Sequence, residues 1–327
     1  MEFRTIVKIP ESPLKITHRS RLVMFGSCFT ESIGNLLQDN KFRVNLNPFG
    51  ILYNPASVSR VIRRIYTEEE FTEKDTFEYN GLYSSFLHHG IFSKPDKHEI
   101  LTSINESLHE SFKDLSSSNF LIITFGTSYV YYFKETGEVV SNCHKFPSSS
   151  FDRNRLSVSE IITDWKETIH IIRKHNPSIN ILFTVSPIRH WKDGAHENQL
   201  SKSTLLLAID ELQKAHENIF YFPSYEILMD ELRDYRFYGE DMFHPSTVAV
   251  KYIWDVFKKT FFDNETESVL KQWEGIRNAL QHRAFNTETK EHKQFLIQTL
   301  LKIDSFQNKY PYIDCTKEKK NLDDQLK

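Results

Sequence analysis

Five short apolar runs, separated by amphipathic stretches, constrain the fold of this chain more than any other sequence feature. The runs are mostly β-branched or aromatic, and each ends at Gly, Pro, Asn or Ser, which is typical of buried strands. They cover Arg21 to Phe25, Phe42 to Leu46, Asn119 to Phe125, Ile179 to Ser186 and Ile219 to Phe222. Because helical patterns lie between most of them, we predict a parallel sheet with helices on both faces.

The expected helices place their apolar residues on one stripe. The first follows the first run and carries Phe29, Ile33 and Leu37, and another begins near Ser157, which is expected to form a capping box with Glu160. Further helices are expected from Asn54-Pro55, through Ile104 and Phe112, through Leu205 and Leu212, and from Pro245 through Phe257.

Two regions interrupt this alternation. An insertion covers about residues 54–118, and residues 129–140 alternate around a turn, so we expect a β-hairpin added to the sheet. Beyond residue 263 the sequence predicts a helical extension whose last residues, Thr316 to Lys327, are frayed. The expected domains are therefore 1–263 and 264–327.

Composition narrows the possible partners and compartment. The chain is 39% hydrophobic and 26% charged with a net charge of -3, which gives no argument for nucleic acid or an anionic membrane as partner. Its three cysteines do not form a disulfide framework, and no run reaches the roughly 20 apolar residues of a membrane span. We expect a soluble, cytoplasmic protein, and the sequence does not indicate an oligomeric state.

The turn after the first run, Gly26-Ser27-Cys28-Phe29, is the first candidate for chemistry. A serine between a strand and a helix places its hydroxyl at the sheet edge, beside N–H groups at the positive end of the helix dipole. That arrangement supplies a nucleophile and part of an oxyanion hole. The alternative interpretation is that Ser27 only caps the helix.

Three further turns follow the next strands, at the edge where parallel sheets bind ligands. They are Asn47-Pro48-Phe49-Gly50, Gly126-Thr127-Ser128-Tyr129 and Pro187-Ile188-Arg189-His190. Each brings a glycine backbone or a polar side chain to that edge, although Arg189 and His190 are also compatible with an ordinary solvated loop.

A carboxylate and an imidazole follow the last strand. Asp241 and His244 are three residues apart, so Asp241 can orient His244, and His244 can take a proton from Ser27. The same spacing recurs at Asp193 and His196. His244 is favoured because it precedes the last helix that packs on the sheet, next to the first strand in a 2-1-3-4-5 order.

Taken together, these motifs resemble those of the GSCFA family, which is related to the SGNH or GDSL hydrolases. The matching residues cover most of residues 20 to 260, with Thr30 in place of the family's alanine. They are Gly26 to Thr30, Asn47 to Gly50, Tyr53 to Pro55, Gly126 and Thr127, Tyr129 to Tyr131, Asn142 to Lys145, Ser186 to His190, Ser201 and Lys202, and His244 to Ser246.

The resemblance implies a flavodoxin-like, three-layer α/β/α hydrolase, and the sequence itself predicts no metal or other cofactor. By analogy with SGNH enzymes, Ser27 is both the nucleophile and an oxyanion N–H donor, Gly50 is a second donor, and Asp241 and His244 complete the triad. The third SGNH motif normally supplies an asparagine to the oxyanion hole, but the turn that begins at Gly126 has none. Thr127, Ser128 or Asn142 are the replacements considered, and a missing donor costs about 3 kcal/mol of barrier lowering.

Other side chains are candidates for the same site. His144, Lys145, Arg189 and His190 are candidates for a basic wall that selects an anionic or sugar-like substrate. Cys28 is an alternative nucleophile, but a small apolar role in the core is favoured. Cys28, Cys143 and His144 are too few ligands to predict a metal site.

The sequence thus predicts an SGNH-type esterase or acylhydrolase acting on a small-molecule or glycan ester. Two alternatives stay open: an O-acyltransferase on the same scaffold, and a non-catalytic module that binds a carbohydrate or another ligand.

Overall fold

The computed structural model describes residues 4–282 and 285–326. Contacts divide them into two compact units. The sheet unit contains residues up to Pro10, Arg21–Asn35 and Val44–Val256, and the helical unit contains Glu11–Ser20, Leu36–Arg43 and the chain from Phe257. The expected domains, 1–263 and 264–327, are continuous along the chain, whereas each of these units combines separate segments. The expected domain boundary stays a prediction.

A five-stranded sheet forms the centre of the sheet unit. Its strands are β1 (Arg21–Gly26), β2 (Arg43–Leu46), β5 (Phe120–Phe125), β9 (Asn180–Val185) and β10 (Ile219–Phe222). The order is β2-β1-β5-β9-β10, or 2-1-3-4-5 when these strands are numbered along the chain. The pairs β1–β5, β5–β9 and β9–β10 are parallel. The predicted α/β fold and strand order are confirmed.

Four helices share one apolar core with one face of this sheet. They are α2 (Pro55–Thr67), α3 (Lys97–Ser117), α4 (Val158–His175) and α5 (Gly194–Ala215). Val23, Phe125 and Phe183 from three neighbouring strands pack in this core with Trp165 of α4. The N-terminal caps are those expected: Asn54 Oδ1 accepts from Ser57 N at 2.8 Å, and Ser157 and Glu160 form the capping box.

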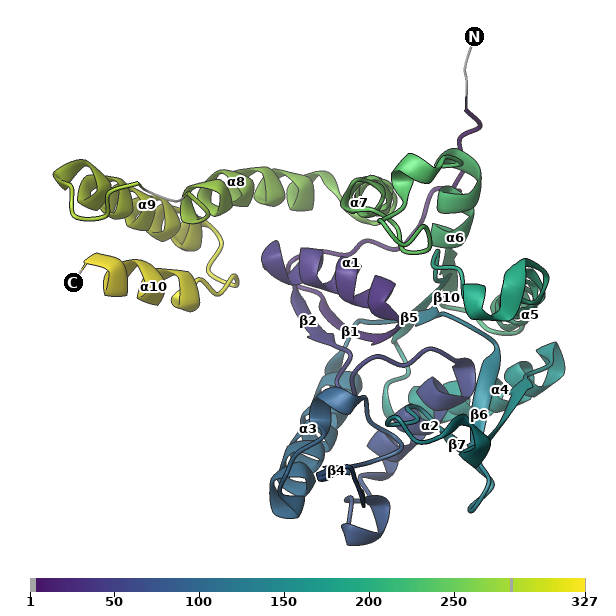
Figure 1. Ribbon diagram of the computed structural model, residues 1–327. Helices are drawn as coiled ribbons and strands as arrows, with labels where there is room; N and C mark the ends of the chain where they lie inside the picture. The colour runs from purple at the N-terminus through teal and green to yellow at the C-terminus, as the bar shows by residue number, and fades with distance from the viewer. Residues whose placement is uncertain (1–3, 283–284, 327) are drawn as a thin grey trace. The chain divides into compact units, whose positions relative to one another are not determined.

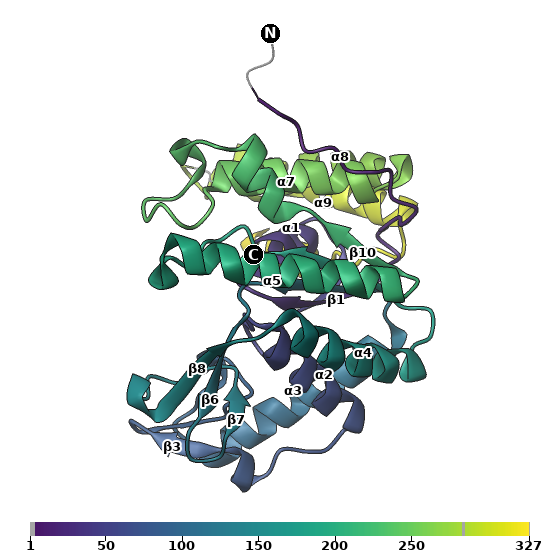
Figure 2. The same cartoon turned by 90° about the vertical axis from the view of Figure 1, so that its right-hand side faces the viewer.

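Helix α1 (Cys28–Asp39) and helix α7 (Thr247–Phe261) lie on the opposite side of the sheet from α2, α3 and α4 (Figures 1 and 2). The layers are therefore helices, sheet and helices, as predicted. α7 begins two residues after Pro245, where its first helical residue was expected. Shorter helical segments are α6 (Ser224–Glu226), a π-helix at Ile227–Glu231 and single 3-10 turns at Glu73–Asp75, Gly90–Phe92, Ser148–Ser150, Trp191–Asp193 and Tyr235–Phe237.

The predicted hairpin forms, but its predicted place in the main sheet is wrong. Strands β6 (Tyr129–Phe133) and β7 (Glu138–Val140) pair antiparallel, and β6 also pairs with β8 (Phe151–Arg155) in a separate three-stranded sheet. The reason is that β5 has β1 and β9 on its two sides, so a strand that follows β5 directly finds no free edge. The insertion adds a second small hairpin, β3 (Phe77–Tyr79) and β4 (Leu82–Ser84).

The helical unit contains α8 (Asn264–Leu280), α9 (Lys290–Lys309) and α10 (Thr316–Leu326) around Trp273, Ile303 and Phe306. The expectation of a frayed end is wrong for Thr316–Leu326, because α10 buries Leu322 against this core and Lys319 pairs with Asp304 at 2.6 Å; Lys327 lies outside the described residues. In the part of the chain that the structure describes, no helix has the length and apolarity needed to cross a membrane.

Candidate active site

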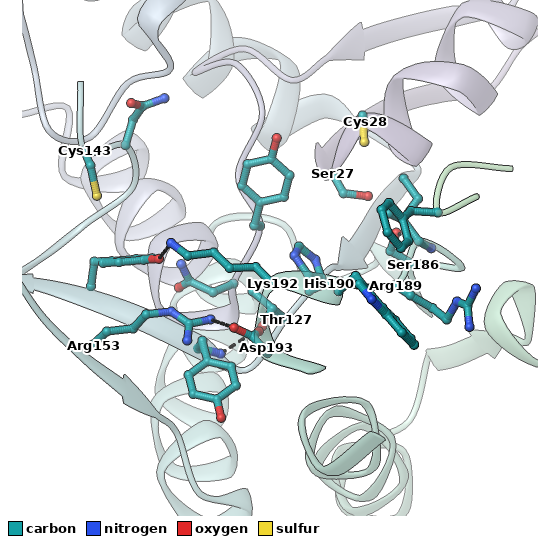
Figure 3. Close-up of a pocket in the computed structure, with 18 of the residues that line it drawn as sticks. Ser27, Cys28, Thr127, Cys143, Arg153, Ser186, Arg189, His190, Lys192 and Asp193 are labelled. Atoms are coloured by element: carbon teal, nitrogen blue, oxygen red, sulfur yellow. Dashed lines mark hydrogen bonds and ion pairs between the residues drawn. The ribbon is translucent and has the colours of Figure 1, made fainter. Parts of the chain in front are cut away.

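A cavity of about 530 Å³ opens where β1, β5 and β9 end. Its walls come from the turns after these strands, from the β6 hairpin and from the segment before α7 (Figure 3). Four of the predicted turns or segments contribute Ser27, Thr127, His190 and His244 to it. The cavity therefore lies at the edge of the sheet where the predicted turns meet.

Gly26 fixes the position of Ser27. Its φ is +151°, and a Cβ there would meet Thr124 O at 2.4 Å, so the turn accepts only glycine. Asn47 Oδ1 accepts from Gly26 N at 2.9 Å and holds the turn from the side of β2. Ser27 follows directly and is 1% exposed, at the N-terminus of α1.

Ser27 both caps the helix and lines the cavity, so the two interpretations of this residue are compatible. Its Oγ accepts from Phe29 N at 3.3 Å, and its carbonyl oxygen accepts from Thr30 N at 2.8 Å. The N–H groups that precede these two at the helix N-terminus have no partner within the helix, and they carry the positive end of its dipole. A negative charge that forms on an atom beside Ser27 is therefore stabilised here.

Asp241 and His244 form the predicted carboxylate-imidazole pair. Asp241 Oδ2 lies 2.5 Å from His244 Nδ1, and its Oδ1 accepts from the backbone N–H groups of Phe243 and His244. These backbone hydrogen bonds, followed by that of the His244 ring, lower the pKa of Asp241 to about 2. Asp241 is thus an anion that orients His244 with Nε2 pointing away from it.

The other Asp-x-x-His sequence does not form such a pair in the described residues. Asp193 Oδ1 instead pairs with Arg153 at 2.6 Å. Ser27 and His244 line the same cavity, but no hydrogen bond joins them among the described contacts.

Several predicted oxyanion donors are already engaged. Gly50 N donates to Asn47 O at 2.6 Å, and Gly50 lines a neighbouring hollow instead of the cavity beside Ser27. The N–H groups of Gly126 and Thr127 both donate to Tyr53 O, at 2.7 and 3.1 Å. Ser128 is 0% exposed and donates through its Oγ to Ser201.

Asn142 and His144 have different positions. Asn142 lines the cavity, and its Oδ1 accepts from His144 N at 2.8 Å. The ring of His144 points elsewhere, because its Nε2 lies 2.9 Å from Ser85 O and the ring packs edge-on against Phe77. His144 is therefore outside the cavity wall.

Arg189 and His190 both line the cavity and are only partly exposed. His190 is anchored by its backbone N, which donates to Asn198 Oδ1 at 2.9 Å. A Cβ at Gly126 would lie 3.3 Å from His190 Nε2, so this imidazole lies directly over the glycine of the third turn. Burial and then the charges of Lys202 and Arg153 lower the pKa of His190 to about 4, so the ring is neutral near pH 7.

Two family models match most of this sequence. Residues 21–257 match the GSCFA family, and residues 273–327 match the C-terminal domain of GSCFA domain proteins. The chain belongs to the GSCFA family.

Two esterases are among the solved structures that are similar to this GSCFA protein. A family 3 carbohydrate esterase of Clostridium thermocellum is 10% identical, with a TM-score of 0.36 over 77% of this chain and 97% of that one. An acetyl xylan esterase, Est2A, of the rumen bacterium Butyrivibrio proteoclasticus is 13% identical, with a TM-score of 0.37 over 76% of this chain and 64% of that one. The comparison with curated proteins found no match.

One buried lysine of this GSCFA chain has a role that was not predicted from its motif. Lys202 of α5 is 1% exposed, and its Nζ donates to Gly126 O at 2.6 Å and to Ser186 O at 2.7 Å. It therefore joins the ends of β5 and β9 beneath the cavity. The signal was available, because Lys202 continues the apolar stripe of Leu205, Ile209 and Leu212 at helical spacing.

The cysteines of this GSCFA protein are poor nucleophiles. Cys28 and Cys143 both line the cavity, and burial raises the pKa of each thiol. The reactive thiolate is correspondingly disfavoured at Cys28. Among the described residues, no group of three or more His, Cys, Asp or Glu side chains is placed to hold a metal ion.

Proposed function

We propose that this protein is a serine hydrolase that cleaves an acyl ester. One observation carries the proposal: Ser27, at the N-terminus of α1, and His244, oriented by Asp241, line one cavity at the carboxyl edge of a parallel sheet. A hydroxyl and a base that line one cavity, with a carboxylate that orients the base, are the groups that acyl transfer to serine requires.

In the proposed reaction, Ser27 Oγ attacks the acyl carbon while its proton passes to His244 Nε2. The tetrahedral intermediate collapses as His244 returns the proton to the departing alcohol, which leaves an acyl-enzyme. Water then attacks the acyl-enzyme, with His244 as base, and releases the acid and free Ser27. Ser27 Oγ accepts from Phe29 N, which leaves its own proton free to be donated. The proposed reaction requires Oγ to come within hydrogen-bond distance of His244, and such contacts tighten when substrate binds.

The first oxyanion donors in this mechanism are the backbone N–H groups of Ser27 and Cys28, since those of Phe29 and Thr30 already donate to Ser27. We assign a further donor to His190 Nε2, in place of the asparagine that the third SGNH motif usually supplies. Two observations support His190: it lies over Gly126, and Ser128, at the asparagine position, has its hydroxyl engaged by Ser201. A neutral imidazole with its proton on Nε2 can donate a hydrogen bond to the developing charge.

Labelling of Ser27 by a fluorophosphonate, mapped by mass spectrometry, tests the proposed function. The expected result is one adduct on Ser27 that is lost in Ser27→Ala and strongly slowed in His244→Ala, because the attacking hydroxyl then lacks its base. Ser141→Ala is the matched control, since Ser141 also lines the cavity but has no assigned role. It should label at the wild-type rate.

Two outcomes contradict this assignment. An adduct on Cys28 would move the nucleophile by one residue. No adduct in the wild-type protein would favour a module that binds its ligand without catalysis. Transfer of a labelled acyl group to a carbohydrate faster than to water would instead identify an acyltransferase that uses the same Ser27.

A further inference from the structure

We propose that the substrate of this site carries an anionic group, which Arg189 and Lys192 attract into the cavity. This inference rests on the proposed function of Ser27 and adds the charge class of the ester. It extends the basic wall expected from the sequence, but with Lys192 in place of His144 and Lys145, neither of which lines the cavity.

The cavity wall is basic in a chain that is acidic as a whole. Its lining includes three cations, Arg153, Arg189 and Lys192, and one carboxylate, Asp193, while the whole chain has a net charge of -3. Overall composition therefore does not account for the local excess of positive charge. Since like charges repel, gathering them around one cavity costs free energy that an anionic ligand would offset.

The carboxylate of Asp193 is already occupied. It pairs with Arg153 at 2.6 Å, and its side chain is 3% exposed. Arg153 also packs on the ring of Tyr129, with 3.9 Å from its Cζ to the ring centroid. This pair is thus part of the wall, and the unbalanced charge belongs to Arg189 and Lys192.

Arg189 is held in place without a carboxylate partner among the described residues. Its guanidinium lies over the rings of Trp191 and Tyr238, at 5.2 Å from each centroid, and its Nη2 donates to Met242 O at 3.2 Å. Its Nε is buried and has no hydrogen-bond partner. A partly desolvated guanidinium with free donors is suited to bind an oxyanion.

Lys192 is exposed and has no carboxylate within ion-pair distance in the described chain; its Nζ donates to Tyr131 OH at 3.4 Å. Figure 3 shows Lys192 and Arg189 extending to opposite sides of His190. The charges therefore flank the reacting centre, so the anionic group can belong to the acyl part or to the alcohol part of the ester.

Hydrolysis of matched charged and neutral esters tests the proposal in two arms. The acyl arm compares the adipate half-ester of 4-nitrophenol with 4-nitrophenyl hexanoate. The alcohol arm compares 4-acetoxybenzoate with its methyl ester. In at least one arm, we expect wild-type kcat/KM to favour the charged ester about tenfold, as one charge-assisted hydrogen bond allows, and salt to reduce that preference.

The double variant Arg189→Gln/Lys192→Gln should remove the preference while still hydrolysing the neutral ester. The matched control is Lys134→Gln/Lys214→Gln, which removes two exposed cations outside the cavity lining and should retain the preference. Two results would overturn the inference and leave the esterase proposal intact. One is equal rates for both esters in both arms of the wild-type assay, and the other is a preference for the charged ester that survives in the Arg189→Gln/Lys192→Gln variant. If no ester is hydrolysed in a manner that depends on Ser27, the proposed function itself fails.

Discussion

Ser27, His190 and His244 differ in how their polar atoms are already engaged, and this difference assigns their roles in the proposed mechanism. Ser27 Oγ has a single weak contact from Phe29 N, so it can turn toward a substrate. His244 is oriented by an anionic Asp241 and is 55% exposed in its side chain. His190 is neutral; its backbone N donates to Asn198 Oδ1, and its ring packs edge-on against Tyr53.

Replacing His190 with leucine is expected to lower kcat by about a hundred- to a thousandfold with little change in KM, because the lost donor acts only on the developing oxyanion. His190→Gln keeps an N–H donor and should retain most of the activity. Steady-state kinetics of both variants on a neutral ester check this expectation. Equal losses in the two variants, or a loss confined to KM, would argue against a donor role.

The pH dependence of kcat/KM provides a second measurement on His190. Because its pKa is about 4, His190 stays neutral above about pH 5, so its own titration does not limit activity near neutral pH. The acid limb should therefore lie at the same pH in wild type and His190→Gln. A limb that moves to lower pH in this variant would identify His190 as the titrating base.

The sequence predicted the turns of the site better than the direction of each polar atom within them. Ser27, Asp241 and His244 could be located because strand ends and short spacings are visible in the sequence. The hydroxyl of Ser128 could not be assigned, since its partner Ser201 lies 73 residues away and is brought there by α5. The position of His190 over Gly126 likewise depends on how two separate strand ends meet.

At the scale of elements, α5 does more than cover the sheet. Its Lys202 donates to the first carbonyl oxygen after β5 and to the first after β9. The turns after these two strands carry Gly126 and His190. Burial lowers the pKa of Lys202 to about 7. A neutral amine still has two N–H donors, enough for both carbonyl groups, so the link does not require the charged form.

The lowered pKa of Lys202 gives a pH dependence of stability. Between pH 7 and 10.5 the unfolded chain holds a proton on this amine that the folded chain has released, so the free energy of unfolding should rise with pH in this range. In Lys202→Met that contribution is absent. Urea unfolding at pH 7 and pH 9.5 should therefore show wild type gaining stability relative to Lys202→Met.

Lys166→Met, which changes an exposed lysine of α4, is the matched control and should follow the wild-type pH dependence. If Lys202→Met also runs parallel to wild type, the amine is not held neutral in the folded protein. If Lys202→Met is less stable than wild type by the same free energy of unfolding at both pH values, that loss reflects the two carbonyl groups left without their donor.

At the scale of the whole molecule, the helical unit combines early and late parts of the chain. Trp273 of α8 is 1% exposed and donates from Nε1 to Asp39 O at 2.7 Å, and Lys41 Nζ lies 5.0 Å from its ring centroid. Trp273→Ala should lower the free energy of unfolding by about 3–5 kcal/mol, as removal of a buried tryptophan does. Urea unfolding measures this change.

Leu301→Ala is the control on the neighbouring α9, because Leu301 is 55% exposed, and it should change stability by no more than about 0.5 kcal/mol. Similar small effects of both substitutions would mean that the helical unit does not depend on Trp273. A large effect of Trp273→Ala alone would show that it does.

This arrangement has a consequence for the order in which the protein can mature. The chain leaves the ribosome from its N-terminus, yet Asp39 and Lys41 emerge long before Trp273, with which they pack. The end of α1, the helix that follows Ser27, therefore has no packing partners until most of the chain has been made. A nascent chain that stops early cannot complete the helical unit, so premature termination should leave a product open to proteolysis.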